Sequence, residues 1–347
     1  MELGTLLVAS TACVSGLLWA GGHLHLEEAQ AAEYVGPRAP QLPVEDRAIP
    51  AAAMEPASMW DGPIATGTFL GKSDEELLEP LRTGKLVSVK VNRGGTSISL
   101  RLTFDNGSRA AFKPQQTNYQ TIPRKEVAAY RISRLLSLES VQPAIGRAFP
   151  MNELIARLRP DSRRHAARLR QEMINRSGKV IGEMSWWIPV IKTPKIDGFR
   201  IDEVEGIVTW KRHLKAKTEV PAEHAELLAQ LSNMLVFDFL INNPDRWSGG
   251  NARASADGRK LFFMDNTLSF GPHPRAARKV RLYMARTQKF SRRLVEHLRN
   301  LDEELVIRAL EEDPGAFEFL LTDRELEAMF SRKAIILAYV DELIAEH

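Results

Sequence analysis

The stretch 233–270 constrains the fold most, because a buried helix, a polar loop and a buried strand follow one another within it. Apolar residues recur at helical spacing as far as Leu240, which predicts a buried helix. The helix should stop before Pro244, since proline disfavours helical geometry in the residue that precedes it. The apolar run 260–264 then predicts a short buried strand.

Three polar side chains stand at the junctions of this stretch: Asp245 after the helix, Asn251 in the loop and Asp265 at the end of the strand. Taken singly, they read as a proline turn, a glycine loop and a solvated acid, which are all common. Phosphoryl transfer from a nucleotide needs one carboxylate near the attacking hydroxyl, and a second carboxylate with an amide oxygen on a divalent metal. The combination therefore favours a phosphoryl-transfer site.

The sequence DFLINNPDRWSGGN, followed by FFMDN, resembles the active-site segment of the secretory-pathway kinases. This family includes the four-jointed protein kinases, the Golgi casein kinase and the xylosylkinases. The resemblance implies that Asp245 is the catalytic base and that Asp265 and Asn251 are metal ligands. It also implies ATP as the nucleotide and Mg²⁺ or Mn²⁺ as the cation.

The region 85–113 predicts three strands, because apolar residues alternate in it and turn residues separate the alternating runs. Gly94 and Gly95 in the first turn would allow close approach of the backbone to phosphates. Lys113, at the end of the third strand, is either a solvated surface residue or a lysine that binds nucleotide phosphate. Its Phe-Lys-Pro context resembles the nucleotide-lysine strand of the secretory kinases.

The following segment, 121–138, predicts a helix with one apolar stripe. Glu126 lies in its first turns, either as a carboxylate favoured by the helix dipole or as the acid that holds the lysine of a kinase-like site. The resemblance to the secretory kinases extends over this helix and implies Lys113 and Glu126 as the nucleotide-binding pair. The family pattern has a second acid just upstream of this glutamate, but residues 121–125 contain no carboxylate. In the four-jointed pattern the metal ligand follows the base by five residues, whereas Asn251 follows Asp245 by six. These two departures leave an inactive pseudokinase as an alternative.

The patterns in the rest of the chain are less specific for one structure or function. Residues 141–149 predict a strand or extended hinge towards a second lobe, and 182–190 resemble an edge strand or a wall. The basic helical segment 151–176 is either a solvated face or a contact for an acidic substrate or an anionic glycan. We expect a variable loop over 193–221 and packing helices from 293 onwards.

The expected fold is α+β: a bilobal, protein-kinase-like domain with a small β-rich N-lobe and a larger, mainly helical C-lobe. We expect a signal sequence or membrane anchor over 1–31, a flexible tether over 32–60 and the kinase-like domain over 61–347. Within that domain the N-lobe should span about 61–145 and the C-lobe about 146–347.

The composition of the chain restricts the functions that it could have. The net charge of only +3 argues against a general nucleic-acid role. No cysteine follows residue 31, so the domain forms no disulfide and departs from the animal secretory kinases, which favours a distant, bacterial relative. The sequence predicts transfer of the ATP γ-phosphate to a Ser/Thr hydroxyl of an exported protein, in the secretory pathway, periplasm or extracellular space. A sugar hydroxyl as acceptor, nucleotidyl transfer and an inactive scaffold are the alternatives, and the N-terminal segment could contact a membrane.

Overall fold

The computed structural model describes residues 67–247 and 250–346. The predicted signal sequence or anchor and the predicted tether lie outside these residues. Over the part that is described, no helix has the length and apolar character needed to cross a membrane.

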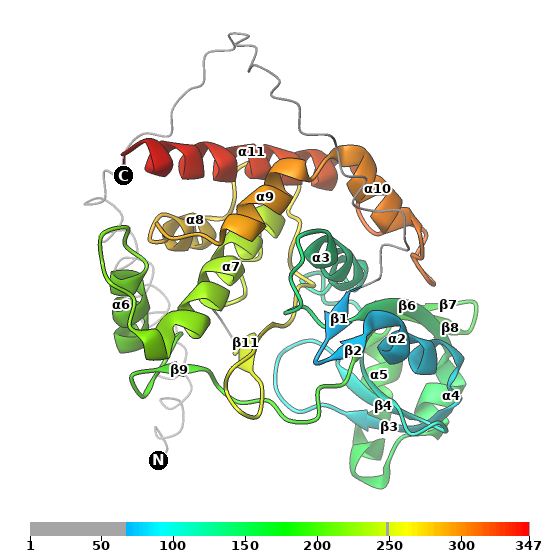
Figure 1. The fold of residues 1–347 in the computed structure, drawn as a ribbon. Coiled ribbons are helices and arrows are strands. Elements are labelled where there is room, and N and C mark those ends of the chain that lie inside the picture. Colours follow the sequence, from blue (N-terminus) through cyan, green and yellow to red (C-terminus); the bar gives the residue numbers. More distant parts are fainter. Residues whose placement is uncertain (1–66, 248–249, 347) are drawn as a thin grey trace, which may run out of the picture. The chain divides into compact units, whose positions relative to one another are not determined.

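The N-lobe is built on an antiparallel sheet of six strands in the order β3-β4-β5-β8-β6, with β7 paired to β8 (Figure 1). The three strands predicted for 85–113 are confirmed as β3, β4 and β5. A separate two-stranded ribbon, β1 and β2, precedes them. The strands of this lobe are β1 (Thr68–Phe69), β2 (Lys72–Ser73), β3 (Leu86–Val91), β4 (Leu100–Phe104), β5 (Arg109–Pro114), β6 (Ala144–Pro150), β7 (Asn175–Arg176) and β8 (Lys179–Trp186).

The strand β8 is central rather than at an edge, so the edge-strand prediction for 182–190 is wrong. Met184 pairs with Phe112 on one side and with Ile145 on the other. Both rows of backbone groups of β8 are therefore used in the sheet, and its side chains are buried over most of its length. The sheet continues to Trp186, past the lobe boundary that we expect near residue 145.

Helices cover the sheet and its exposed edge. Helix α2 begins at Ser73, whose side chain and Glu76 form the reciprocal capping box expected from the sequence. Helix α3 is buried along nearly its whole length and contacts both β6 and β8. The helical prediction for 151–176 is confirmed over α4, η1 and α5 but is wrong at its end, where Asn175–Arg176 form β7. The helical part lies along β3, where the backbone N–H of Val89 donates to Arg157 O. The helices of this lobe are α2 (Asp74–Thr83), α3 (Arg124–Leu135), α4 (Met151–Ala156), the 3₁₀ turn η1 (Pro160–His165) and α5 (Ala166–Glu172).

The C-lobe is mainly helical and is organised around α7, which contacts α8 and α11 (Figure 1). Helix α10 packs against α3 of the N-lobe, and β11 and β12 form a hairpin beside α7. The elements of this lobe are β9 (Lys195–Ile196), β10 (Phe199–Arg200), α6 (Val204–His213), η2 (Ala222–His224), α7 (Ala225–Ile241), β11 (Ala252–Ala254), β12 (Leu261–Phe263), α8 (Arg278–Met284), α9 (Arg292–Asn300), α10 (Glu303–Glu311) and α11 (Asp323–Glu346).

The expected loop over 193–221 contains a hairpin and the helix α6. The helix packs around Trp210, which is fully buried and donates its indole N–H to Ile201 O. The sequence of α6 does not show the single apolar stripe that predicts a helix, because Val204 and Val208 are exposed and apolar residues therefore occur on both faces. The two-lobed α+β architecture otherwise agrees with the prediction.

Candidate active site

The end of helix α7 sets the position of the polar loop. The helix ends, as predicted, at Asn242, whose φ of 53° lies in the left-handed region that stops helices. Asn243 then links the loop to the end of β12: its amide donates to Asp265 O and to Asn266 Oδ1, both at 3.2 Å. Its Oδ1 accepts the backbone N–H of Asp245 at 3.0 Å, which fixes the turn that presents Asp245.

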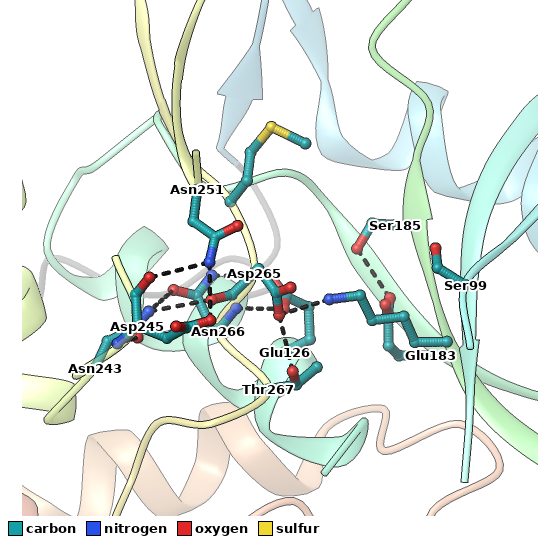
Figure 2. A network of polar contacts seen from close by, with 12 residues as sticks. Ser99, Glu126, Glu183, Ser185, Asn243, Asp245, Asn251, Asp265, Asn266 and Thr267 are labelled. Carbon is teal, nitrogen blue, oxygen red and sulfur yellow. Dashed lines mark hydrogen bonds and ion pairs between the residues drawn. The ribbon is translucent and has the colours of Figure 1, made fainter. Parts of the chain in front are cut away.

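Asp245 and Asn251 lie together, as the sequence predicts for a shared site (Figure 2). The amide Nδ2 of Asn251 donates to Asp245 Oδ2 at 3.0 Å and to Asp245 O at 3.1 Å. Both residues are half-buried. Between them Trp247 stacks on Tyr283 of α8, with ring centroids 4.5 Å apart, and this contact anchors the loop to the C-lobe.

Arg246 joins the loop to the helix and the strand. Its guanidinium, 1% exposed, pairs with Asp238 of α7 at 3.0 Å and donates to Asn266 Oδ1 at 2.6 Å and to Met264 O. Burial raises the pKa of the Asp238 carboxyl to about 6, and the charge of Arg246 opposes this rise. No role for Arg246 was predicted from the sequence, because its acceptors lie in α7, at Asn251 O in the loop and at the end of β12.

Asp265 is where the two lobes meet. It leaves β12 with a φ of 58°, a left-handed conformation that is uncommon outside glycine and that turns the carboxylate away from the strand direction. Its Oδ1 lies 2.5 Å from Lys113 Nζ of β5 and accepts a hydrogen bond from Thr267 Oγ1 at 2.8 Å. Burial would raise the pKa of Asp265, but the charge and hydrogen bond of Lys113 outweigh it and lower the pKa.

Glu126 faces the same point from α3 but contacts Asn266 directly. Its two carboxylate oxygens accept from the Asn266 backbone N–H at 2.6 Å and from the side-chain Nδ2 at 2.8 Å. Asn266 is fully buried and is the direct partner of Glu126, whereas Lys113 acts on Glu126 through its charge. Burial raises the pKa of Glu126, and Lys113 opposes the rise through its charge.

A third carboxylate, Glu183 of β8, is part of this cluster and was missed in the sequence. It stands directly opposite Lys113 in the sheet register, is 2% exposed and accepts a hydrogen bond from Ser185 Oγ at 2.9 Å (Figure 2). Burial and the nearby charge of Glu126 raise its pKa well above the ordinary value. The available signal was a carboxylate that stands as the one charged residue in the mainly apolar run 180–186.

Lys113 therefore faces three carboxylates. Burial by itself would lower its pKa, but the charges of Asp265, Glu126 and Glu183 raise it above its usual value. The three carboxylates thus favour the cationic form of Lys113. Carboxylate oxygens gathered at one point also favour a divalent metal, which would bind together with nucleotide phosphates.

Gly94 and Gly95 occupy the turn between β3 and β4, with φ of 95° and 76°. Both are exposed, and a Cβ added to either would meet no atom within 4 Å. Glycine is therefore favoured here by the backbone conformation, and the backbone of the turn is open to a ligand.

The donor set of the site is compatible with a hard divalent cation. Asp265, Asp245 and Asn251 offer carboxylate and amide oxygens, the ligands that Mg²⁺ and Mn²⁺ prefer. Among the described residues, no group of three or more His, Cys, Asp or Glu side chains is arranged to hold a metal ion. Mg²⁺ in nucleotide sites is usually bound by one or two carboxylates together with phosphate oxygens and water, so this geometry fits such a role.

Comparisons with known proteins agree with this architecture. No protein-family model matches the chain. The human extracellular serine/threonine protein kinase FAM20C is 26% identical over 247 residues, which cover 57% of this chain and 41% of FAM20C. The mouse pseudokinase FAM20A is 22% identical over 304 residues, which cover 74% of this chain and 56% of FAM20A. The chain thus spans about half the length of these two relatives.

Solved structures show the same fold at low sequence identity. The crystal structure of the Golgi casein kinase superposes with a TM-score of 0.62 at 17% identity, over 78% of this chain and 75% of that one. The Mn/ADP-bound structure of that kinase gives a TM-score of 0.61, over 78% of this chain and 76% of the other. The structure of hydra Fam20 with sugar gives 0.60 at 17% identity, over 81% and 93% of the two chains.

The fold and the polar network define a protein of the kinase-like class. Within that class, the similarity to FAM20C and FAM20A in sequence and to the Fam20 structures in fold confirms the resemblance to the secretory-pathway kinases. The chain is similar to the Fam20 proteins in sequence and in fold.

Proposed function

We propose that this chain is an ATP-dependent phosphotransferase that moves the γ-phosphate of ATP to a hydroxyl group, most favourably a Ser or Thr of an exported protein. The observation that supports this best is the 2.5 Å ion pair between Lys113 and Asp265, because it joins the sheet to the helix–loop–strand segment of Asp245. This is the arrangement in which a kinase-like site binds phosphates on one side and orients the acceptor on the other.

In the proposed reaction the acceptor hydroxyl oxygen forms a bond to the γ-phosphorus while the bond from that phosphorus to the β,γ-bridging oxygen breaks. The hydroxyl proton passes to the Asp245 carboxylate, and ADP leaves with the bridging oxygen. Lys113 neutralises phosphate charge, and the turn of Gly94 and Gly95 covers the phosphates with its backbone. A Mg²⁺ or Mn²⁺ ion bound by Asp265 and Asn251 would supply further charge neutralisation.

The buried residues of the site position these groups rather than react. Glu126 holds Asn266, and Asn266 with Asn243 fixes the end of β12 on which Asp265 stands. Arg246 holds the loop of Asp245 against the same strand end. A site so fixed before substrate binds loses little energy in reorganising during the reaction.

Two features support the remaining alternatives. A hydra Fam20 structure contains sugar, which favours a sugar hydroxyl as a second candidate acceptor. FAM20A is described as a pseudokinase, and this chain has no carboxylate between Thr121 and Lys125, which keeps an inactive scaffold as a rival.

Export is part of the proposal. FAM20C is an extracellular kinase, and the first 31 residues of this chain have the composition of a signal sequence or anchor. We place the kinase-like domain in the secretory pathway, periplasm or extracellular space, with residues 32–60 as its tether.

The test uses the full chain with ATP labelled at either the γ- or the α-phosphate, in Mn²⁺ or Mg²⁺, with casein and a simple glycoside as acceptors. Transfer of the γ-label alone that is lost in Asp245→Asn establishes the kinase, and the labelled acceptor tells protein from sugar. Transfer of the α-label would show nucleotidyl transfer. No transfer of either label, with the fold intact, would favour the scaffold.

A further inference from the structure

Positive charge is concentrated in two segments of the C-lobe. Residues 204–218, which contain α6, have four Lys or Arg and one carboxylate, Glu205. Residues 271–293, which contain α8, have eight Lys or Arg and no Asp or Glu. Twelve basic residues against one carboxylate leave a surplus of eleven positive charges, whereas the net charge of the whole chain is only +3. Such segregation of charge indicates a surface that binds an extended anionic partner.

The two segments adjoin in the folded domain. Trp210 of α6 contacts Tyr283 of α8, with ring centroids 5.9 Å apart. After the two helices, the backbone N–H of Gln288 donates to Leu214 O at 2.9 Å, and the side chain of Gln288 accepts from the backbone N–H of Ala216 at 3.2 Å. The exposed residues of 204–218 and 271–293 are therefore called the basic face.

Several cations of the basic face have no internal partner. Lys211, Lys279 and Arg281 are exposed, and none of them forms an ion pair within 4 Å with a carboxylate of the described residues. The same is true of Lys215 and Lys217. No ion pair has to break when these side chains approach an anionic surface, so their attraction to it is not reduced by the loss of an internal contact.

Helix α6 adds apolar side chains to the same face. Val204 and Val208 are 73% and 60% exposed. Lys211 follows them at helical spacing, which places the three side chains on one side of the helix. The other side of α6 carries Gly206 and Trp210, which are buried. Exposed apolar residues in line with a lysine are typical of helices that lie in the interface of a bilayer.

Among extended anionic partners, a phospholipid bilayer fits this combination best. A nucleic acid or a sulfated glycan would bind the cations through its phosphates or sulfates but would leave the two valines in water. The interface of an anionic bilayer accepts both groups, because its headgroups attract Lys and Arg and its acyl chains remove apolar side chains from water.

We infer that the basic face docks the folded domain on a bilayer that contains anionic phospholipid, with Val204 and Val208 entering the boundary between headgroups and acyl chains. The inference does not depend on the proposed phosphoryl transfer. Residues 1–60 do not supply a preference for anionic lipid, because they contain seven carboxylates and only two arginines.

The test measures sedimentation of the full chain with vesicles of phosphatidylcholine and with vesicles that also contain phosphatidylglycerol. Each Lys or Arg near an anionic surface changes the affinity roughly fivefold, so the wild type should bind the anionic vesicles about tenfold more tightly or better. The preference should decrease at high salt. The triple variant Lys211→Gln, Lys279→Gln, Arg281→Gln should lose most of it.

The matched control removes the same charge from the N-lobe. Lys85, Arg109 and Lys179 are exposed and lie outside the basic face, so the variant Lys85→Gln, Arg109→Gln, Lys179→Gln has the same net charge as the first triple variant. It should keep the preference for anionic vesicles. The two variants together separate an effect of the basic face from an effect of net charge.

A second pair of substitutions tests the apolar part of the face. Val204→Ser with Val208→Ser should weaken binding to anionic vesicles about tenfold, because less apolar surface leaves water on docking. Binding to a heparin fragment should be unchanged by the same substitutions. Both valines are exposed, so urea unfolding should show the wild-type midpoint for this variant and for the two triple variants.

Three results would overturn the inference. The first is equal binding of the wild type to the two kinds of vesicle. The second is a preference that the two triple variants retain or lose to the same extent. The third is a heparin fragment that binds more tightly than the anionic vesicles while the valine substitutions have no effect on vesicle binding, since the face would then bind a soluble polyanion.

Discussion

Replacing Glu325 by glutamine should lower the free energy of unfolding by about 3 kcal/mol at pH 7. Glu325 of α11 accepts hydrogen bonds from Arg124 at 2.8 and 3.1 Å and pairs with Lys125 at 2.9 Å. Its side chain is only 6% exposed. The two cations begin α3, the helix that carries Glu126, so this contact ties the helix of the proposed site to the C-lobe.

The magnitude follows from the pKa of Glu325. Burial alone would raise it, but hydrogen bonds from Arg124, Lys125 and the backbone N–H of Thr322 lower the pKa from 4.5 to about 2. Each unit corresponds to about 1.4 kcal/mol, which gives about 3 kcal/mol for the ionised carboxylate. Because the folded-state pKa is below the unfolded value, this stability is fully present above pH 4.5 and is lost as the pH falls towards 2.

Urea unfolding followed by tryptophan fluorescence should therefore show a difference between wild type and Glu325→Gln that is constant above about pH 5 and shrinks below pH 4.5. Glu327→Gln is the control, since Glu327 is exposed on the same helix, and it should change stability by less than about 0.5 kcal/mol. A variant within 0.5 kcal/mol of wild type at pH 7, or a difference that persists undiminished near pH 2, would refute the reasoning.

Three further predictions concern the sheet and the site. Gly146→Ala should lower the free energy of unfolding in urea by about 1–3 kcal/mol, because the added Cβ would lie 2.7 Å from the Phe317 ring and close to neighbouring backbone. An unchanged unfolding midpoint would contradict this. Lys113→Met removes the cation 2.5 Å from Asp265 and should weaken ATP binding about tenfold in calorimetry, whereas wild-type affinity would remove Lys113 from the nucleotide site. The Cβ of Gly95→Val would meet no atom within 4 Å, but the valine must adopt a φ of 76°, so the variant should lose about 1–2 kcal/mol or more in the same unfolding assay. No loss would mean that the turn readily adopts another conformation.

The sequence predicted those parts of the fold that local patterns determine. The helix that ends at Asn242 and the strand before Asp265 follow from apolar periodicity and one proline, and the hairpins from alternation and turn residues. The central place of β8 could not be predicted in this way, because alternation shows which face of a strand is buried but not which strands flank it.

The candidate site was predictable to the same extent. Asp245, Asn251 and Asp265 lie in one segment, so their spacing in the sequence was enough to predict that they share a site. Glu183 and Arg246 acquire their roles only through long-range contacts, with β5 in one case and with α7 and the end of β12 in the other. The ion pair of Lys113 with Asp265 is likewise a consequence of tertiary packing.

The central claim is that the cluster of Lys113, Glu126 and Asp265 is a metal-dependent nucleotide site. Calorimetric titration of the full chain with ADP, with and without Mn²⁺, measures this directly, and Asp265→Ala is the critical variant. The account predicts that Mn²⁺ tightens ADP binding in the wild type and has no such effect in Asp265→Ala. Nucleotide binding that is equally tight with and without Mn²⁺, or that is unchanged in Asp265→Ala, would contradict it.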